Sequence, residues 1–265
     1  MSNIFFSIKK LYNDDYILLQ EKRKKMKKFI LSLVLCLCVT PFIFADTVST
    51  DSSGFEKVSS KIYDAVYDMR YYSDYNFTGH RIDGYHAPVA YMTKEALAAL
   101  VIAADDLRKQ GYRIFIWDTY RPQKAVTDFV NWINNPNDPG NKSFYPDITK
   151  DNLLSGNYVA AKSGHSRGST IDLTIIKQNG EFVDMGGTFD FFGEESHPDY
   201  KKLTKKQKNN RKILRDAMLN AGFKPIDSEW WHFTLKDEPY PDTYFDFDVE
   251  YFLQNSSGKT TSINF

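Results

Sequence analysis

A single apolar segment near the N-terminus does most to limit what this chain can fold into. Residues 29–45 carry no charged side chain and consist mainly of Leu, Val, Ile, Phe and Cys, and residues 22–28 before them are almost all Lys or Arg. A basic stretch, an apolar stretch and a small residue, here Ala45, are typical of a secretory signal peptide. We therefore expect residues 1–45 to be a leader and the folded part to begin at residue 46.

The alternative for this segment is a membrane anchor that is retained. An apolar run of this length, interrupted by Pro41, is at the short limit for crossing a hydrocarbon core about 30 Å thick. We expect cleavage after Ala45, export to the periplasm or the cell exterior, and no integral membrane segment after the leader is removed. Initiation at Met26 would give a more conventional leader, which N-terminal sequencing of the precursor tests.

The formal net charge of zero, from 34 basic and 34 acidic side chains, combines two unlike parts. Eight basic and three acidic residues fall within residues 1–45, so residues 46–265 carry a formal charge of −5. An acidic domain is a poor candidate for binding nucleic acid, which needs a basic surface. With 42% hydrophobic and 15% aromatic residues, the chain is also too apolar to be disordered.

Both cysteines, Cys36 and Cys38, lie within the apolar segment. The exported domain therefore has no disulfide, no cysteine nucleophile and no thiolate ligand for a metal. Any metal site in it must use nitrogen and oxygen ligands.

The spacing of apolar residues predicts a small set of helices and strands. The helices are expected over residues 93–111 with Thr93 as N-cap, over residues 122–133 with Pro122 at the start, and over residues 206–221. Strands are expected at residues 112–117, 169–176 and 229–235. Because the strands come from separated parts of the chain, we expect an α+β fold, a single domain with a central, mostly antiparallel sheet flanked by helices.

This domain is expected to span residues 56–250. Residues 46–55 are small and polar and predict a flexible arm in front of it, and residues 251–265 are expected to be a C-terminal tail.

Two pairs of a histidine and a carboxylate stand out in the sequence. His165 lies in a glycine-flanked loop, and Asp172 follows on a strand whose neighbours Ile171 and Leu173 are apolar. A carboxylate beside an apolar core is costly unless it is hydrogen-bonded, paired with a cation or bound to a metal.

The second pair, Glu229 and His232, lies among tryptophan and phenylalanine residues. Three nitrogen or oxygen ligands with an open fourth position are the arrangement of a catalytic zinc site, and a nearby free carboxylate can act as general base. Asp172 is short and suits a ligand, and Glu229 has the reach of a base, but the residues alone leave that choice open. They also leave open that both histidines are structural.

Seven segments of the sequence resemble the D-alanyl-D-alanine dipeptidase family of zinc enzymes. They follow the family order across residues 57–249, and they are Tyr75–Gly79, Trp117–Pro122, Lys162–Thr174, Asp184–Phe191, Glu195–His197, Glu229–His232 and Asp237–Phe247.

The resemblance implies a catalytic role for several residues. By the family's motifs, His165, Asp172 and His232 are ligands of one catalytic zinc ion per chain, set in a cleft. Glu229 is then the catalytic base, and Arg121 faces the scissile carbonyl. A guanidinium is physically suited to that place because it stabilises an oxyanion without changing its protonation.

The resemblance also implies residues that recognise the substrate. Asp190 corresponds to the residue that holds the substrate ammonium, and Ser163 to a substrate-binding serine. Tyr71 is expected to complete the pocket, and Asp118 to position Arg121.

The activity implied by the resemblance is zinc-dependent hydrolysis of D-alanyl-D-alanine to two D-alanines, by a peptidase domain over residues 56–250. It would be linked to cell-wall peptide turnover or to glycopeptide resistance. Two alternatives are a D,D-carboxypeptidase or endopeptidase of the same superfamily that acts on longer peptidoglycan peptides, and a zinc-stabilised wall-binding module without catalysis.

Overall fold

The computed structural model describes residues 21–26, 46–155, 158–250, 252–254 and 260–262. The chain divides into two units between Ala45 and Asp46. In the first unit residues 21–26 are helical, and the apolar run of the expected leader lies outside the described residues. Within the described ranges, no helix combines the length and the apolar character needed to cross a membrane.

The second unit is built on a five-stranded sheet with the strand order β3-β5-β6-β8-β7. The strands are β3 (Val66–Tyr67), β5 (Tyr112–Asp118), β6 (Thr170–Lys177), β7 (Phe223–Pro225) and β8 (His232–Leu235). Only the β3–β5 pair of this sheet is parallel, and the three other pairs are antiparallel. The predicted α+β fold with a mostly antiparallel sheet is confirmed.

Six further strands among the described residues form three two-stranded pairs. They are β1 (Thr47–Ser49) with β9 (Thr243–Phe245), β2 (Phe55–Lys57) with β4 (Tyr91–Thr93), and β10 (Phe252–Gln254) with β11 (Thr260–Ser262). Residues 46–55 were expected to be a flexible arm, but residues 47–49 form strand β1 and pair with β9. The small polar side chains there gave no sign of packing, but the backbone of β1 binds β9, and Phe55 is buried.

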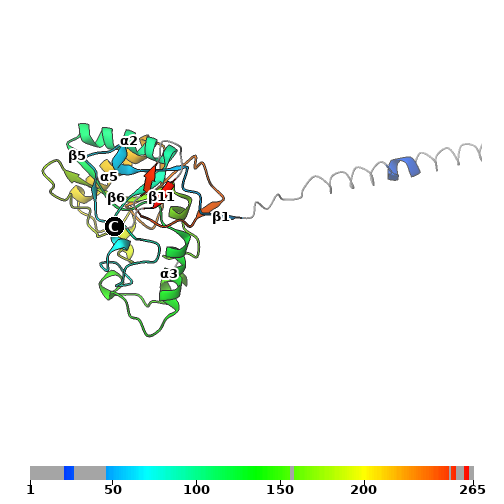
Figure 1. The fold of residues 1–265 in the computed structure, drawn as a ribbon, viewed down its shortest axis with the longest axis horizontal. Helices are drawn as coiled ribbons and strands as arrows, with labels where there is room; N and C mark the ends of the chain where they lie inside the picture. Colours follow the sequence, from blue (N-terminus) through cyan, green and yellow to red (C-terminus); the bar gives the residue numbers. More distant parts are fainter. Residues whose placement is uncertain (1–20, 27–45, 156–157, 251, 255–259, 263–265) are drawn as a thin grey trace, which may run out of the picture. The chain divides into compact units, whose positions relative to one another are not determined.

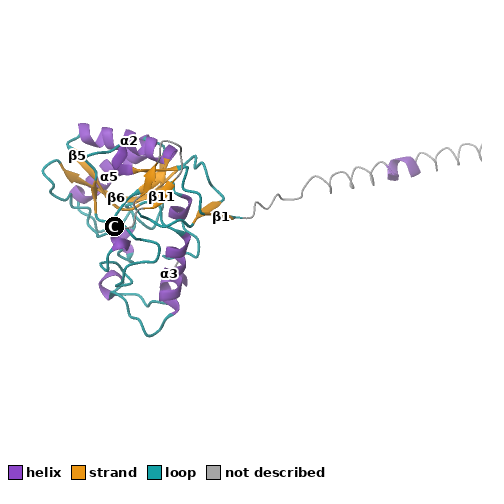
Figure 2. Ribbon diagram, in the orientation of Figure 1, coloured by secondary structure: helices purple, strands orange, loops and turns teal. Residues whose placement is uncertain are grey.

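In the part of the second unit that the structure describes, four α-helices accompany the sheet: α2 (Lys94–Lys109), α3 (Gln123–Asn134), α4 (Asn152–Ser155) and α5 (Lys205–Asn220). Thr93 caps α2 as predicted, and its side chain accepts a hydrogen bond from Ala96 N at 3.4 Å. Helices α2 and α5 contact each other and contact strands β5 and β7 (Figure 1). Helix α3 contacts α4 in a second region rich in loops (Figure 2).

In the described residues, five short 3-10 helices lie in the connections. They are η1 (Val58–Ser60), η2 (Arg70–Tyr72), η3 (Lys142–Phe144), η4 (Gly164–Arg167) and η5 (Glu194–Ser196).

A β-bulge at Trp117 determines which side chains of β5 face those of β6. Ile116 pairs with Leu173, but Asp118 pairs with Asp172, so Trp117 is an extra residue in the ladder. Leu173 and Asp172 point to opposite faces of the sheet because side chains alternate along a strand. The extra residue therefore brings Asp118 to the same face as Asp172, as bulges near functional sites often do.

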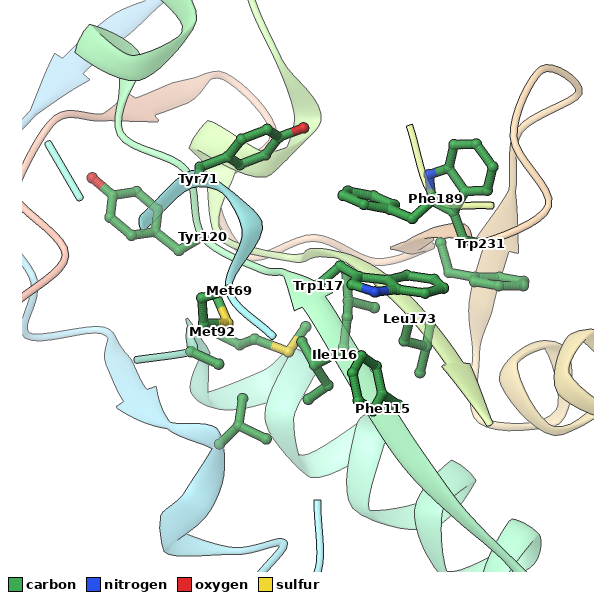
Figure 3. Close-up of a cluster of buried hydrophobic side chains, with 14 of the residues drawn as sticks. Met69, Tyr71, Met92, Phe115, Ile116, Trp117, Tyr120, Leu173, Phe189 and Trp231 are labelled. Atoms are coloured by element: carbon green, nitrogen blue, oxygen red, sulfur yellow. The ribbon is translucent and has the colours of Figure 1, made fainter. Parts of the chain in front are cut away.

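Aromatic packing fixes a long loop against this sheet. Trp117 stacks on Phe189 with ring centroids 4.8 Å apart and an angle of 12° between the planes, and Trp231 meets Phe189 edge-on (Figure 3). All three side chains are buried. The stack fastens residues 185–197, which lie between β6 and α5, beside the strand that carries Asp118.

Gly168, which follows η4, has a conformation and surroundings that suit only glycine. Its φ is +80°, and a Cβ atom there would lie 2.2 Å from Phe55 Cε1. We expect Gly168→Ala to lower the free energy of unfolding by about 2–5 kcal/mol, measured by urea denaturation, because left-handed strain adds to overpacking.

The matched control for this variant is Gly180→Ala. Gly180 has a φ of +88°, but a Cβ atom there would meet nothing within 4 Å. We expect a loss of about 1–2 kcal/mol from the backbone conformation alone. Equal losses in the two variants would contradict the packing part of the argument.

Candidate functional site

Three neighbouring strands place three polar residues side by side on one face of the sheet. Asp172 of β6 pairs with Asp118 of β5 on one side and with His232 of β8 on the other. Residues directly opposite each other in adjacent strands share a face. The sheet register therefore builds part of the site, and burial of β6 on both faces makes the polar side of this strand an interior wall.

The 3-10 helix η4 brings His165 to the same place. Ser163 caps η4 by accepting a hydrogen bond from His165 N at 3.2 Å. The ring of His165 is fixed by a 2.7 Å contact between its Nδ1 and the carbonyl oxygen of Thr119. With Nδ1 engaged as a donor to this carbonyl, Nε2 is left as the ligand atom, which is the arrangement typical of histidines that bind metals.

His165, Asp172 and His232 together form a cluster that fits a metal ion. Their ligand atoms all lie within 4.8 Å of one another. His165 Nε2 is 3.3 Å from His232 Nδ1 and 3.2 Å from Asp172 Oδ2, and His232 Nδ1 is 3.0 Å from Asp172 Oδ1. Two imidazole nitrogens and a carboxylate suit zinc, whose bonds of about 2.0–2.1 Å place tetrahedral ligands about 3.3 Å apart.

The charges in this cluster support one another. Burial acts to raise the pKa of Asp172, but the charges and hydrogen bonds of His165 and His232 outweigh it and hold the pKa below its usual range. Burial acts to lower the pKa of His232, and the hydrogen bond and charge of Asp172 outweigh it in turn. The carboxylate therefore stays ionised, as a metal ligand must be.

Glu229 lies next to this cluster without belonging to it. Its Oε2 is 3.5 Å from His232 Nδ1. Burial, with the charge of Asp172 acting in the same direction, raises the pKa of Glu229 to about 7. A carboxylate with a pKa near neutrality can both take up and release a proton at physiological pH.

Arg121 also lies beside the cluster. Its Nε donates to Asp118 Oδ2 at 2.9 Å, its Nη2 is 3.7 Å from Asp172 Oδ2, and its guanidinium lies 4.8 Å from the centre of the Tyr71 ring. Asp118 is fully buried and also accepts a 2.7 Å hydrogen bond from the hydroxyl of Tyr85. Asp118 thus contacts the guanidinium directly, and its role in positioning Arg121 stays a prediction from the sequence.

Asp190 and Tyr71 meet at another point of the site. The Tyr71 hydroxyl donates to Asp190 Oδ2 at 2.9 Å, and both side chains are buried. Burial raises the pKa of Asp190 well above its usual range, and the nearby charges of Asp172 and Glu229 add to this. Among the described residues, Asp190 is the only non-glycine residue with a positive φ, at 59°. Such strain persists only where surrounding structure enforces it.

A cavity of about 180 Å³ joins these parts. Every site residue predicted from the sequence lines it except Asp118, which lies behind Arg121. The lining residues from that prediction are Tyr71, Arg121, Ser163, His165, Asp172, Asp190, Glu229 and His232. The predicted residues therefore come together in one place.

Two contacts that shape the site were not predicted from the sequence. The hydroxyl of Tyr85 binds Asp118 from 33 positions away, and nothing near Tyr85 in the sequence indicates this. The carbonyl of Thr119 orients His165, and its position within the segment Trp117–Pro122 is the one signal that could have pointed to it.

Comparison with known proteins decides the family. The family model described as D-Ala-D-Ala dipeptidase matches residues 51–250. This chain belongs to the D-Ala-D-Ala dipeptidase family. The resemblance inferred from seven segments is therefore confirmed, and the chain is an enzyme of a peptidase family.

Curated relatives in the dipeptidase family cover most of the chain. The D-alanyl-D-alanine dipeptidase of Enterococcus faecium is 41% identical over 199 residues, which are 74% of this chain and 98% of the relative. That of Streptomyces coelicolor is 43% identical over 185 residues, which are 69% of this chain and 92% of the relative.

Among solved structures, the chain is similar to the vancomycin resistance D,D-pentapeptidase VanY from a VanB-type resistance cassette, in complex with Zn(II). The TM-score is 0.35 at 12% identity, and the alignment covers 57% of this chain and 76% of the other.

The hydroxyl of Tyr85 should stabilise this member of the dipeptidase family. Tyr85→Phe leaves the buried carboxylate of Asp118 without one donor, and we expect the free energy of unfolding to fall by about 1–3 kcal/mol. Urea denaturation measures the loss. The control is Tyr63→Phe, where the side chain is 84% exposed and a change within about 0.5 kcal/mol is expected. A loss no larger than that of the control would show that Asp118 does not need the hydroxyl.

Proposed function

We propose that this chain is a zinc-dependent dipeptidase that hydrolyses D-alanyl-D-alanine to two D-alanines. The observation that carries the proposal is the cavity in which His165, Asp172 and His232 converge while Glu229 and Arg121 flank them. The relatives named D-alanyl-D-alanine dipeptidase support the substrate.

One zinc ion per chain is the proposed cofactor, held by His165, Asp172 and His232. These residues fit it because they offer two imidazoles and one ionised carboxylate at suitable separations. When bound, zinc supplies Lewis acidity to the substrate carbonyl and lowers the pKa of water.

Glu229 is the proposed general base and acid. It takes a proton from the attacking water and returns it to the amine that leaves when the peptide bond breaks. A raised pKa suits both steps, because the same carboxylate must be ionised first and protonated afterwards.

Arg121 is proposed to stabilise the oxyanion that forms on the scissile carbonyl. Its guanidinium is preorganised for this task, because Asp118 fixes Nε and the Tyr71 ring supports its face. Asp118 does not line the cavity, and it is proposed to act through Arg121.

The two ends of the dipeptide require different partners. Asp190, supported by Tyr71, is proposed to bind the substrate ammonium, because the charge of Arg121 does not offset the burial and the neighbouring acids that raise the pKa of this carboxylate. Ser163, which also lines the cavity, is proposed as a second contact with the substrate. A volume of about 180 Å³ favours a dipeptide over a long wall peptide.

The cellular setting is a further part of the proposal. We propose that residues 1–45 are a leader, that the peptidase domain spans residues 56–250, and that the enzyme acts in the periplasm or outside the cell on products of peptidoglycan turnover. The basic and apolar composition of residues 22–45 supports export.

Replacing Glu229 should abolish most of the hydrolysis but should leave zinc binding intact. Glu229→Gln keeps the size of the side chain but removes the base, and we expect turnover to fall by about 10²-fold or more, since proton transfer contributes about 10²–10⁴. Metal analysis of the same sample should still give one zinc per chain. Wild-type turnover by this variant would refute the mechanism.

The length of the substrate distinguishes the proposed activity from its nearest alternative. We expect the purified full-length protein to hydrolyse D-Ala-D-Ala at least about 10-fold faster than a pentapeptide ending in D-Ala-D-Ala, because a small cavity excludes the longer chain. Faster cleavage of the pentapeptide would favour a D,D-carboxypeptidase. Binding of either peptide without cleavage would favour a wall-binding module.

A further inference from the structure

The loop that carries Asp190 is closed by one side chain from outside the cavity. Arg211, on helix α5, is only 6% exposed and donates to three backbone carbonyls of this loop. Its Nε binds Met185 O at 2.6 Å, its Nη2 binds Glu195 O at 2.7 Å, and its Nη1 binds His197 O at 2.8 Å. The guanidinium thus ties the beginning of the loop to its end, with Asp190 between them.

The partners of Arg211 are unusual for a buried cation. No ion pair of the described residues includes it, and the charge of Asp184 does not outweigh the effect of burial, which lowers the pKa of Arg211. Three carbonyl oxygens in different directions take the place of a carboxylate. Only the planar guanidinium has donors arranged as a fork that reaches all three at once, since the ammonium of lysine is a single point of charge.

The loop backbone at Gly187 packs closely against this contact. A Cβ atom on Gly187 would lie 3.2 Å from Glu195 O and 3.3 Å from Arg211 Nη2. The guanidinium also lies 5.3 Å from the centre of the Trp230 ring, and Trp230 N donates to Ser196 O at 2.9 Å. The same contact therefore joins the loop to the segment that continues to His232.

We propose that Arg211 is a positioning residue for the ammonium end of the substrate. It acts through Asp190, whose backbone is held in a strained conformation with a φ of 59° only while both ends of its loop are fixed. This inference rests on the proposed function, because it assigns Arg211 to the recognition of the dipeptide ammonium by Asp190.

The test compares two substrates that differ only in the ammonium group. They are D-Ala-D-Ala and N-propanoyl-D-alanine, which is the same molecule without its amino group. The measured quantity is the ratio of kcat/KM for D-Ala-D-Ala to kcat/KM for N-propanoyl-D-alanine. For full-length Arg211→Lys we expect this ratio to fall at least about 10-fold below that of the wild type, chiefly because KM for D-Ala-D-Ala rises. Zinc content should be unchanged.

A double-mutant cycle separates positioning from a general loss of structure. If Arg211 acts through Asp190, then Asp190→Asn should lower the ratio by itself, and adding Arg211→Lys should lower it little further. Equal losses on both substrates, or additive losses in the double variant, would overturn the inference. A wild-type enzyme that cleaves neither substrate would instead refute the proposed function.

Two further variants keep the test decisive. Arg108→Lys is the matched control, because Arg108 binds Asp64 and Asp105 outside the cavity and its loss should leave the ratio unchanged. If Arg211→Lys fails to fold, Gly187→Ala disturbs the same contact by crowding and should lower the ratio in the same direction. An unchanged ratio in folded Gly187→Ala would also count against the proposal.

Discussion

The arrangement of the site depends on two buried carboxylates on neighbouring strands, which need hydrogen-bond donors and positive charge around them. Asp118 and Asp172 are paired across β5 and β6, and both side chains are almost completely buried. Like charges placed directly opposite each other in a sheet are destabilising unless cations and donors surround them. Arg121 and Tyr85 bind Asp118, and two histidines bind Asp172. The cost of burying two acids thus accounts for the guanidinium, the hydroxyl and the imidazoles around them.

The acidic character of the cavity extends beyond that pair. Glu229 and Asp190 also line it, and burial together with neighbouring negative charge raises the pKa of each. Lys162 also lines the cavity but pairs with Asp46, and the single charge of Arg121, which lies beside Asp118 and Asp172, does not balance four carboxyl groups. A divalent metal at one point and a substrate ammonium at another would supply the missing positive charge, which agrees with the donor set at His165 and His232. The same electrostatic demand therefore favours both the cofactor and a zwitterionic substrate.

Much of this could be predicted from the sequence because the signals are local. Helices α2, α3 and α5 follow apolar spacing, and the residues around the metal lie in short segments with unusual composition. The bulge at Trp117 could not be predicted, since it exists only relative to the register of β6. Tyr85 binds Asp118, which is 33 positions away in the sequence, and Arg211 binds Met185, which is 26 positions away. No pattern near Tyr85 or Arg211 therefore indicates its partner. The strand at residues 47–49 is held by backbone pairing with β9, and the pattern of side chains in a sequence does not indicate such pairing.

Some residues of the site stand on paired strands and one stands on a loop, and the two groups have different proposed tasks. The proposed metal ligands Asp172 and His232 and the acid that holds Arg121 stand on paired strands, where the ladder fixes their separation. Asp190 lies on a loop that owes its shape to aromatic stacking and to Arg211. Bond cleavage requires accurate placement of a few atoms, whereas recognition of an ammonium requires one well-placed charge. A loop anchored from α5 can therefore change in sequence and alter which substrates bind, while the strands keep the reacting groups in place.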